Sequence, residues 1–277
     1  SSNYFDGLLD DVRVYNKVLT EDEIKRLYQI NATTKINKTI TSNTNTLNDT
    51  IGHWTFDGPN IDLSSTTGEV MDRSDSIIKG DWNNHASSTT LGVIGQALDF
   101  DGVDDYIDFG SPSELNVTEF TTAFWVKGDS APSVGGVITS VFQKSSSDSS
   151  DEAAISFEWD HVGSSAIQSC GAKENPSGGF LIAQLGTSLE ANKWYHIACV
   201  YDTSGTPTLR VYLNGVEDGS AATPWGLVTG NPAFRIGAGG TNGNTPGRYF
   251  DGMIDDFRYY DRALSADEVK RLYELGN

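Results

Sequence analysis

Short segments in which apolar and polar residues alternate fill the chain from residue 51 onward. In one of them the apolar residues Leu209, Val211 and Leu213 are spaced two apart, so they lie on one side of the segment. This spacing is typical of a half-buried strand. Such segments occur at 53–56, 96–100, 105–109, 121–127, 137–144, 153–159, 180–185, 193–201, 208–215 and 234–239. Many short strands separated by Gly, Ser and Asn turns predict an antiparallel β-sandwich or barrel.

One strand–helix pattern occurs twice in the chain. Residues 4–28 read YFDGLLDDVRVYNKVLTEDEIKRLY and residues 249–273 read YFDGMIDDFRYYDRALSADEVKRLY, with 15 of 25 positions identical at an offset of 245. The helical half of each copy opens with a capping box, formed by Thr20 and Glu23 or by Ser265 and Glu268. In the second copy the capping box predicts one helix at the C-terminal end of the chain.

The repeat divides the chain into three parts. Residues 1–30 hold the isolated strand–helix, 31–50 form an Asn/Thr-rich linker and 51–277 form the strand-rich domain. Two interpretations of residues 1–30 stay open. They are the end of a preceding repeat in a tandem array, or they associate identical subunits by filling the equivalent place in a neighbouring molecule.

The excess of acidic residues excludes several classes of partner. With 19 Lys and Arg against 38 Asp and Glu, the formal net charge of the 277 residues is −19. Nucleic acid and anionic lipid both require a basic face, so neither is an expected partner. No apolar run approaches the ~18 residues of a membrane span, so no membrane insertion is expected. Acidity at this level suits an extracellular protein or one that binds hard cations, although solubility alone also explains it.

The two cysteines and four glycosylation sequons are features whose state depends on the cellular compartment of the protein. Cys170 and Cys199 form a disulfide in an oxidising compartment or stay as two buried thiols. Four N-x-[ST] sequons are candidate glycosylation sites, at Asn31, Asn37, Asn48 and Asn116.

Aromatic side chains outside the regular predicted strands are the candidate sugar contacts, because sugars bind exposed rings flanked by polar groups. The candidates are Trp82, His85, Trp159, His161, Trp225 and Tyr249. Trp82 is the favoured one, since Asn83, Asn84 and His85 follow it and can hydrogen-bond hydroxyls. For each single tryptophan, packing in the core is the competing interpretation.

Several motifs in a fixed order resemble the laminin-G-like, concanavalin A-like lectin/glucanase superfamily. They are GQALDFDGVDDYIDF, FTTAFWVKG, KWYHIACVYD, TLRVYLNGVEDG, FRIGAG and YFDGMIDDFRYYDRALSADEVKRLYELG. The resemblance covers residues 51–277 and implies an all-β antiparallel jelly-roll sandwich with one C-terminal helix. It also implies an extracellular or cell-surface location. It does not fix the function, because the superfamily includes lectins, adhesion modules and glycosidases.

The resemblance also implies a structural calcium ion. Asp255 lies on the predicted last strand with Met253, Phe257 and Tyr259, and a buried carboxylate there needs a partner. The superfamily often holds calcium at this strand, so Asp255 is the implied ligand, with contributions from Asp57 and Asp72. The alternative is that Asp255 caps nearby backbone N–H groups.

Catalysis is not expected. Laminarinase-like relatives carry Glu-x-Asp-x-x-Glu on one strand, and here Glu158 and Asp160 fill the first two places while Gly163 stands in the third. A retaining glycosidase needs both carboxylates. The run DFDGVDD at 99–105 lacks the spacing of a calcium loop, and its Asp-Gly is typical of a hairpin turn.

The sequence therefore predicts a non-catalytic recognition or adhesion module that binds a glycan or cell-surface glycoconjugate. The alternative is a structural subunit of a surface layer or filament, assembled through residues 1–30. A glycosidase of laminarinase type is the third and weakest interpretation.

Overall fold

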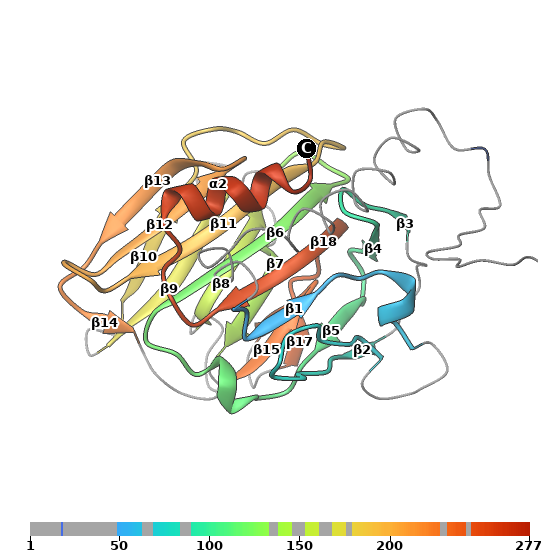
Figure 1. Ribbon diagram of the computed structural model, residues 1–277, viewed down its shortest axis with the longest axis horizontal. Helices are drawn as coiled ribbons and strands as arrows, with labels where there is room; N and C mark the ends of the chain where they lie inside the picture. The colour runs from blue at the N-terminus through green and yellow to red at the C-terminus, as the bar shows by residue number, and fades with distance from the viewer. Residues whose placement is uncertain are drawn as a thin grey trace, which may run out of the picture.

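A computed structural model describes residues 18, 49–62, 69–83, 90–132, 138–145, 153–160, 168–175, 179–227, 232–241 and 245–277. These residues build two antiparallel sheets packed face to face, with one helix on the outside (Figure 1). The described residues include no helix long and apolar enough to cross a membrane. Residues 4–17 and 19–28 and most of the linker lie outside the described residues.

The first sheet has the order β13-β12-β11-β6-β18-β4-β3, with β1 paired to β18. Its strands are β1 (Gly52–Trp54), β3 (Thr90–Leu91), β4 (Gln96–Asp101), β6 (Phe120–Gly128), β11 (Tyr195–Asp202), β12 (Thr208–Leu213), β13 (Val216–Ala222) and β18 (Asp251–Tyr260). The strand β18 is central, because β6 pairs with one edge while β4 and β1 pair with the other.

The second sheet has the order β10-β9-β8-β7-β15-β5-β2, with β14 paired to β9. Its strands are β2 (Asp81–Asn83), β5 (Tyr106–Asp108), β7 (Thr139–Ser145), β8 (Ala153–Asp160), β9 (Ser169–Asn175), β10 (Phe180–Gln184), β14 (Gly226–Leu227) and β15 (Ala233–Ile236). A separate hairpin is made of β16 (Gly239–Thr241) and β17 (Thr245–Gly247), and two 3-10 turns are η2 (Gly58–Asn60) and η3 (Ser113–Leu115).

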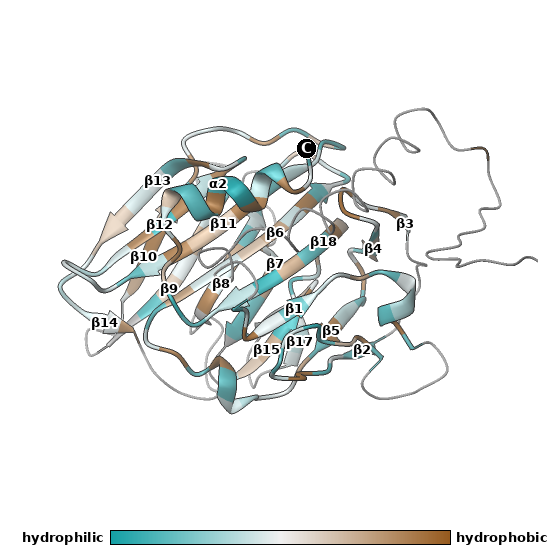
Figure 2. Ribbon diagram, in the orientation of Figure 1, coloured by the Kyte–Doolittle hydropathy of each residue, from teal (hydrophilic) through white to brown (hydrophobic). Residues whose placement is uncertain are grey.

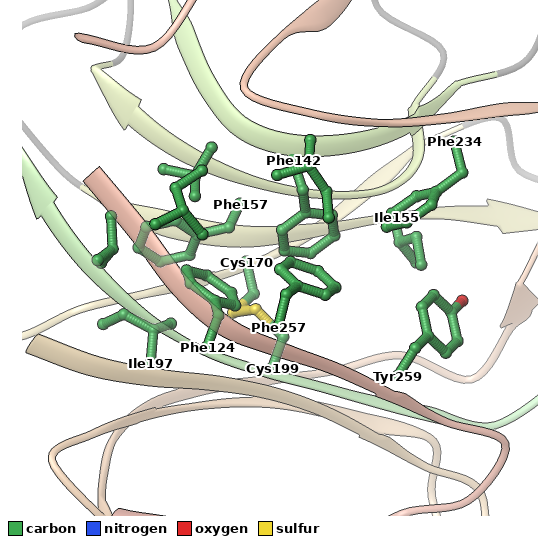
Figure 3. Packing of buried hydrophobic residues seen from close by; sticks show 14 of the residues in the cluster. Phe124, Phe142, Ile155, Phe157, Cys170, Ile197, Cys199, Phe234, Phe257 and Tyr259 are labelled. Carbon is green, nitrogen blue, oxygen red and sulfur yellow. A yellow bond between two sulfur atoms is a disulfide. The ribbon is translucent and has the colours of Figure 1, made fainter. Parts of the chain in front are cut away.

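The core lies between the sheets and is rich in aromatic rings (Figure 3). Phe124 of β6 stacks on Phe257 of β18 with ring centroids 5.2 Å apart, and Phe142 of β7 meets both rings edge-on. The Cys170–Cys199 disulfide crosses this core and joins β9 to β11, with 5.8 Å between the Cα atoms. The two sheets are therefore linked covalently as well as by packing.

The helix α2 (Ala266–Glu274) covers the face of the first sheet that is turned away from the core (Figure 1). Val269 and Leu272 pack on a small apolar cluster with Ala198 and Tyr212 of the sheet. The predicted capping box is present, since the Ser265 side chain accepts from the Glu268 N–H and the Glu268 side chain accepts from the Ser265 N–H. Figure 2 shows alternating hydropathy along several strands, as a half-buried sheet requires.

Two local predictions require correction. A β-bulge between Asp255 and Arg258 breaks the alternation of β18, so Ile254 and Phe257 both enter the core while Met253 does not. The Asp-Gly at 101–102 does form a turn, but it does not form a hairpin. It carries the chain from β4 in the first sheet to β5 in the second.

Candidate functional site

Two of the candidate sugar-binding tryptophans are core residues. Trp82 is 4% exposed and Trp159 is 1% exposed, and both belong to the cluster between the sheets. Trp82 is the middle residue of β2, opposite Ile107 of β5, so its ring points inward with Ile107. The Trp159 indole N–H donates to the backbone oxygen of Ser130 at 3.2 Å. As direct sugar contacts these two predictions are wrong.

The other four candidate sugar contacts are either exposed at the surface or outside the described residues. Trp225 is 43% exposed, and its backbone oxygen accepts a hydrogen bond from the Tyr201 hydroxyl at 3.2 Å. Tyr249 is partly exposed and lies between β17 and β18. His85 and His161 lie outside the described residues.

The Tyr249 ring lies beside Tyr106, and strand register brings Tyr106 together with further polar residues. On the outer face of the second sheet, Asp81 lies opposite Asp108, Asn83 lies opposite Tyr106, and Arg235 lies opposite Asp108. The Tyr106 and Tyr249 rings lie next to each other, with centroids 6.2 Å apart and planes inclined at 43°. The tyrosine patch comprises Asp81, Asn83, Tyr106, Asp108, Arg235 and Tyr249.

An ion pair fixes the polar groups of the tyrosine patch. The Arg235 Nε–H donates to Asp108 Oδ2 at 3.0 Å, and the Arg235 side chain is only 5% exposed. Burial, then the negative charge of Asp108, raises the pKa of the Tyr106 hydroxyl, while Arg235 opposes this shift. Tyr106 therefore stays a neutral phenol that can both donate and accept hydrogen bonds at neutral pH. Two amphipathic rings beside fixed polar groups form a surface suited to sugar rings.

The sequence contained a signal for this patch. In DYIDF the residues Tyr106 and Asp108 are two apart, so they share one face of a strand, and Ile107 between them faces the core. The pairing of this strand with Arg235 and with Asn83 is a property of the sheet order. No local pattern in the sequence gives that order.

Asp255 occupies the buried position expected of it. Its side chain is fully buried, and Oδ2 accepts from the backbone N–H groups of Val93 and Ile94 at 2.7 and 2.8 Å. Among the described residues Oδ1 has no hydrogen-bond partner. Burial and then the charge of Asp256 raise the pKa of this carboxyl well above its usual range, although the two N–H groups oppose the shift. One oxygen therefore caps backbone groups, and the other is available to a proton or a cation.

Asp57 contacts the same loop, residues 92–96, as Asp255 does. Asp57 Oδ1 accepts from the backbone N–H of Gln96 at 2.9 Å, and its charge contributes to the raised pKa of Asp255. The loop passes close to both carboxylates, because a Cβ added at Gly92 would meet Asp255 Oδ2 and one at Gly95 would meet Asp57 Oδ1. The two carboxylates and the narrow glycine loop suit a hard cation that prefers oxygen ligands.

Asp72, the third candidate calcium ligand, instead accepts hydrogen bonds from the turn that follows it. Oδ1 accepts from the N–H groups of His53 and Ser74, and Oδ2 accepts from the Ser74 hydroxyl and the Ile78 N–H, all within 2.7–2.9 Å. A carboxylate has about four acceptor positions, and these four bonds occupy them. Asp72 thus fixes the turn that follows it.

Two further sets of acidic side chains lie on β8 and in the turn at 101–105. Glu158 and Asp160 share one face of β8, and the Thr139 hydroxyl donates to Asp160 Oδ2 at 2.8 Å, but Gly163 lies outside the described residues. In the turn at 101–105, Asp101 Oδ1 accepts from the N–H of Val103 at 2.8 Å. Asp101, Asp104 and Asp105 have carboxylate oxygens within 4.8 Å of one another, as side chains of one tight acidic turn do.

One of the four candidate glycosylation sites falls within the described residues. Asn116 is exposed and directly follows η3. Asn31, Asn37 and Asn48 lie outside the described residues.

Comparison with known proteins places this chain in a family. Residues 101–270 match the family model described as the concanavalin A-like lectin/glucanases superfamily. The curated proteins contain no match to the chain. Among solved structures the chain is similar to domain 4 of AbnA, an extracellular arabinanase from Geobacillus stearothermophilus, in complex with arabinotriose. The identity is 20% over 83% of this chain and 98% of that one, with a TM-score of 0.60.

Toxin binding domains show the same fold. The binding domain of Paraclostridial Mosquitocidal Protein 1 is 13% identical over 82% of this chain and 52% of its own, with a TM-score of 0.61. The binding domain of botulinum neurotoxin serotype G is 14% identical over 82% and 51%, with a TM-score of 0.57. This chain spans about half the length of these two structures, and at such identity the likeness shows the fold alone.

Proposed function

Because the chain belongs to the concanavalin A-like lectin/glucanase superfamily, we propose that it is a non-catalytic extracellular recognition module that binds glycan through the tyrosine patch. Its natural ligand is then a polysaccharide or a cell-surface glycoconjugate. The observation that carries the proposal is the Tyr106–Tyr249 pair beside the Asp108–Arg235 ion pair on an outer sheet face.

The chemistry of the tyrosine patch supports a neutral sugar. A sugar ring has an apolar face that packs on an aromatic ring, while its hydroxyls need hydrogen-bond partners in fixed positions. Asn83 and Asp81 supply an amide and a carboxylate on the neighbouring strand. The net charge of −19 disfavours polyanionic glycans.

Arabinotriose is the first probe, since the arabinanase domain of the same fold was solved with it. We expect calorimetry to show binding to the full chain, weakened at least tenfold in Tyr249→Ala and Tyr106→Ala, because each loses one ring of the pair. Trp225→Ala is the matched control, being an exposed aromatic outside the patch. If a panel of neutral oligosaccharides also gives no heat, or if Trp225→Ala alone removes binding, the tyrosine patch is not the site.

The absence of catalysis is part of the same proposal. It is supported by Gly163 at the place where laminarinase-like relatives carry the acid/base Glu. Hydrolysis of β-glucans that disappears in Glu158→Gln would overturn it.

We also propose that Asp255 and Asp57 hold a structural calcium ion, with backbone carbonyls completing the six to eight oxygen ligands that calcium takes. The support is the buried Asp255 Oδ1, which has no partner among the described residues, and the nearby Asp57 carboxylate. When bound, the ion would neutralise the two carboxylates and fix the loop at 92–96.

Thermal melting tests the calcium proposal. We expect millimolar calcium to raise the Tm of the full chain above its value in EDTA, since a ligand that binds only the folded state stabilises it. Asp255→Asn should remove this difference. Asp101→Asn, in the exposed acidic turn, should retain it. A calcium shift that survives Asp255→Asn would place the ion elsewhere.

A further inference from the structure

One row of outward-facing side chains crosses the second sheet from the strand β2 to the strand β7. Strand register places Asp81 opposite Asp108, and Arg235 follows on the other side of Asp108. The next residue of the row is Gln143 of β7, which lies opposite Arg235. Asp81 is exposed and the Asp108 side chain is 27% exposed, but Arg235 and Gln143 are only 5% and 3% exposed. The row is therefore open to solvent at β2 and covered at β7.

The hairpin β16–β17 packs on the outward-facing side chains of β7. The Gly240 N–H donates to Gln143 Oε1, and the backbone oxygen of Arg248, directly after the hairpin, accepts from the Ser140 N–H at 2.9 Å. A side chain has no room between them, because a Cβ added at Gly239 would lie 2.6 Å from Ser140 Oγ and 2.8 Å from Gln143 Oε1. The hairpin is thus a wall in direct contact with the sheet at the inner end of the row.

The aromatic rings of the tyrosine patch lead from the open end of the row to this wall. Tyr106 lies opposite Asn83 of β2, and the Tyr249 ring is its neighbour, with 6.2 Å between the centroids. Tyr249 directly follows Arg248, which is bonded to β7, so its ring lies on the β7 side of Tyr106. The Tyr249 hydroxyl donates to the backbone oxygen of Pro246 in β17 at 3.3 Å. A sugar chain that packs on both rings therefore runs from β2 toward the hairpin.

The distance available before the wall is short. Neighbouring strands lie about 4.8 Å apart, so β2, β5 and β15 together span only about 10 Å. A sugar chain that lies along the rings fills this width and then meets the hairpin. At the other end it leaves the protein past the exposed Asp81. A site that is closed at one end and open at the other accepts the end of a chain and excludes an internal stretch by steric overlap.

We propose that the tyrosine patch binds the terminal units of a neutral glycan chain, and that the hairpin β16–β17 is the stop against which the chain end lies. This inference rests on the proposed glycan-binding function and adds which part of the glycan is bound. A long polysaccharide then offers binding sites only at its ends, so the amount of protein bound follows the number of chains and not their mass.

Calorimetry on the full chain with arabinotriose and linear arabino-octaose is the first test. A site for chain ends should give the same Kd per mole of chain for both sugars, within about twofold, and one protein bound per chain. A site for an internal stretch of three units would bind the octaose about sixfold more tightly, because three units fit on eight in six positions. That second result would overturn the inference while leaving the proposed function in place.

Modification of each chain end is the second measurement on the native protein. Borohydride reduction changes the sugar at the reducing end of arabino-octaose, and a bulky ether on the last sugar blocks the opposite end. One of these two octaoses should bind at least tenfold more weakly than the unmodified sugar, and the other should bind equally well. Full affinity for both would overturn the inference. If neither arabinotriose nor any other neutral oligosaccharide binds, the proposed function fails and this inference fails with it.

Gly239→Ala tests the role of the hairpin, since the added Cβ pushes the hairpin away from β7. The variant should still bind arabinotriose and should gain affinity for the octaose, because the stop has moved. Gly226→Ala is the matched control, since its Cβ would meet no atom within 4 Å, and it should bind both sugars as the native protein does. A Gly239→Ala protein that melts cooperatively and binds both sugars equally would contradict the hairpin as the stop. If this variant does not fold, the two measurements on the native protein decide the question.

Discussion

At the scale of single residues, the direction of a side chain decides its role more than its chemical type does. Trp82 was favoured for its type and its polar neighbours, yet its place in β2 turns it into the core, and Asn83 beside it faces outward. Tyr106 and Asp108 face the same way as Asn83. Residue types alone therefore selected Tyr249, whose ring lies beside Tyr106, but missed the other residues of the tyrosine patch.

Asp255 shows the limit of periodicity. The sequence indicated a carboxylate in an apolar environment, and the structure places it there with Oδ1 unpartnered among the described residues. The reasoning through a regular alternation was wrong, however, because the bulge at Asp255–Arg258 and the positive φ of Asp256 shift the register. A bulge of this kind leaves no clear mark in a pattern of period two.

At the scale of elements, strands with strong alternation were predictable and strands with small or polar residues were not. The segment SCGAKEN (169–175) forms β9 and VEDGSAA (216–222) forms β13, although neither alternates clearly. Their pairing with β8 and β12 makes them strands. The turn between β12 and β13 was predictable, since Asn214 and Gly215 both have the positive φ of a type I′ turn.

The helix cap belongs to this scale and predicts a pH dependence. Partial burial by itself raises the pKa of the Glu268 carboxyl. Hydrogen bonds from Arg262 and Ser265 outweigh it and lower this pKa to about 2. A lowered pKa gives stability that is present above the unfolded value of 4.5 and is lost as the pH falls toward 2. Glu268→Gln should cost about 1 kcal/mol in urea unfolding at pH 7 and little at pH 2.

Glu274→Gln is the matched control for this prediction. Glu274 lies at the other end of α2, where it makes only an exposed ion pair of 3.8 Å with Lys270. Its replacement should leave the free energy of unfolding nearly unchanged at both pH values. Equal losses for both variants would mean that net charge, not the cap, controls the acid sensitivity.

At the scale of the whole molecule, the two sheets and their covalent link form one unit. The sequence predicted the fold class because motif order and alternation extend over the whole of residues 51–277. The order of strands within each sheet, on which the tyrosine patch depends, was not predictable from one sequence. The sequence allows Cys170 and Cys199 to be either bonded or free, and in the structure they form a disulfide between β9 and β11.

The disulfide predicts a stability difference for the whole sandwich. Cys170→Ala/Cys199→Ala should lower the free energy of unfolding by about 3–4 kcal/mol, because the cross-link restricts the unfolded chain over 29 residues of separation. Urea titration of the oxidised protein against the double variant measures it. A reducing agent should shift the midpoint of the native protein and leave that of the variant in place.

The pairing of β1 with β18 has a consequence for synthesis on the ribosome. Gly52 and Tyr259 are register partners although 207 positions separate them, from 52 to 259. Chains emerge at about 5–20 residues per second, so the first strand of the sandwich waits for roughly ten seconds or more before its partner exists. The sandwich therefore closes only after β18 has been synthesised, because β1, β4 and β6 all pair with that strand.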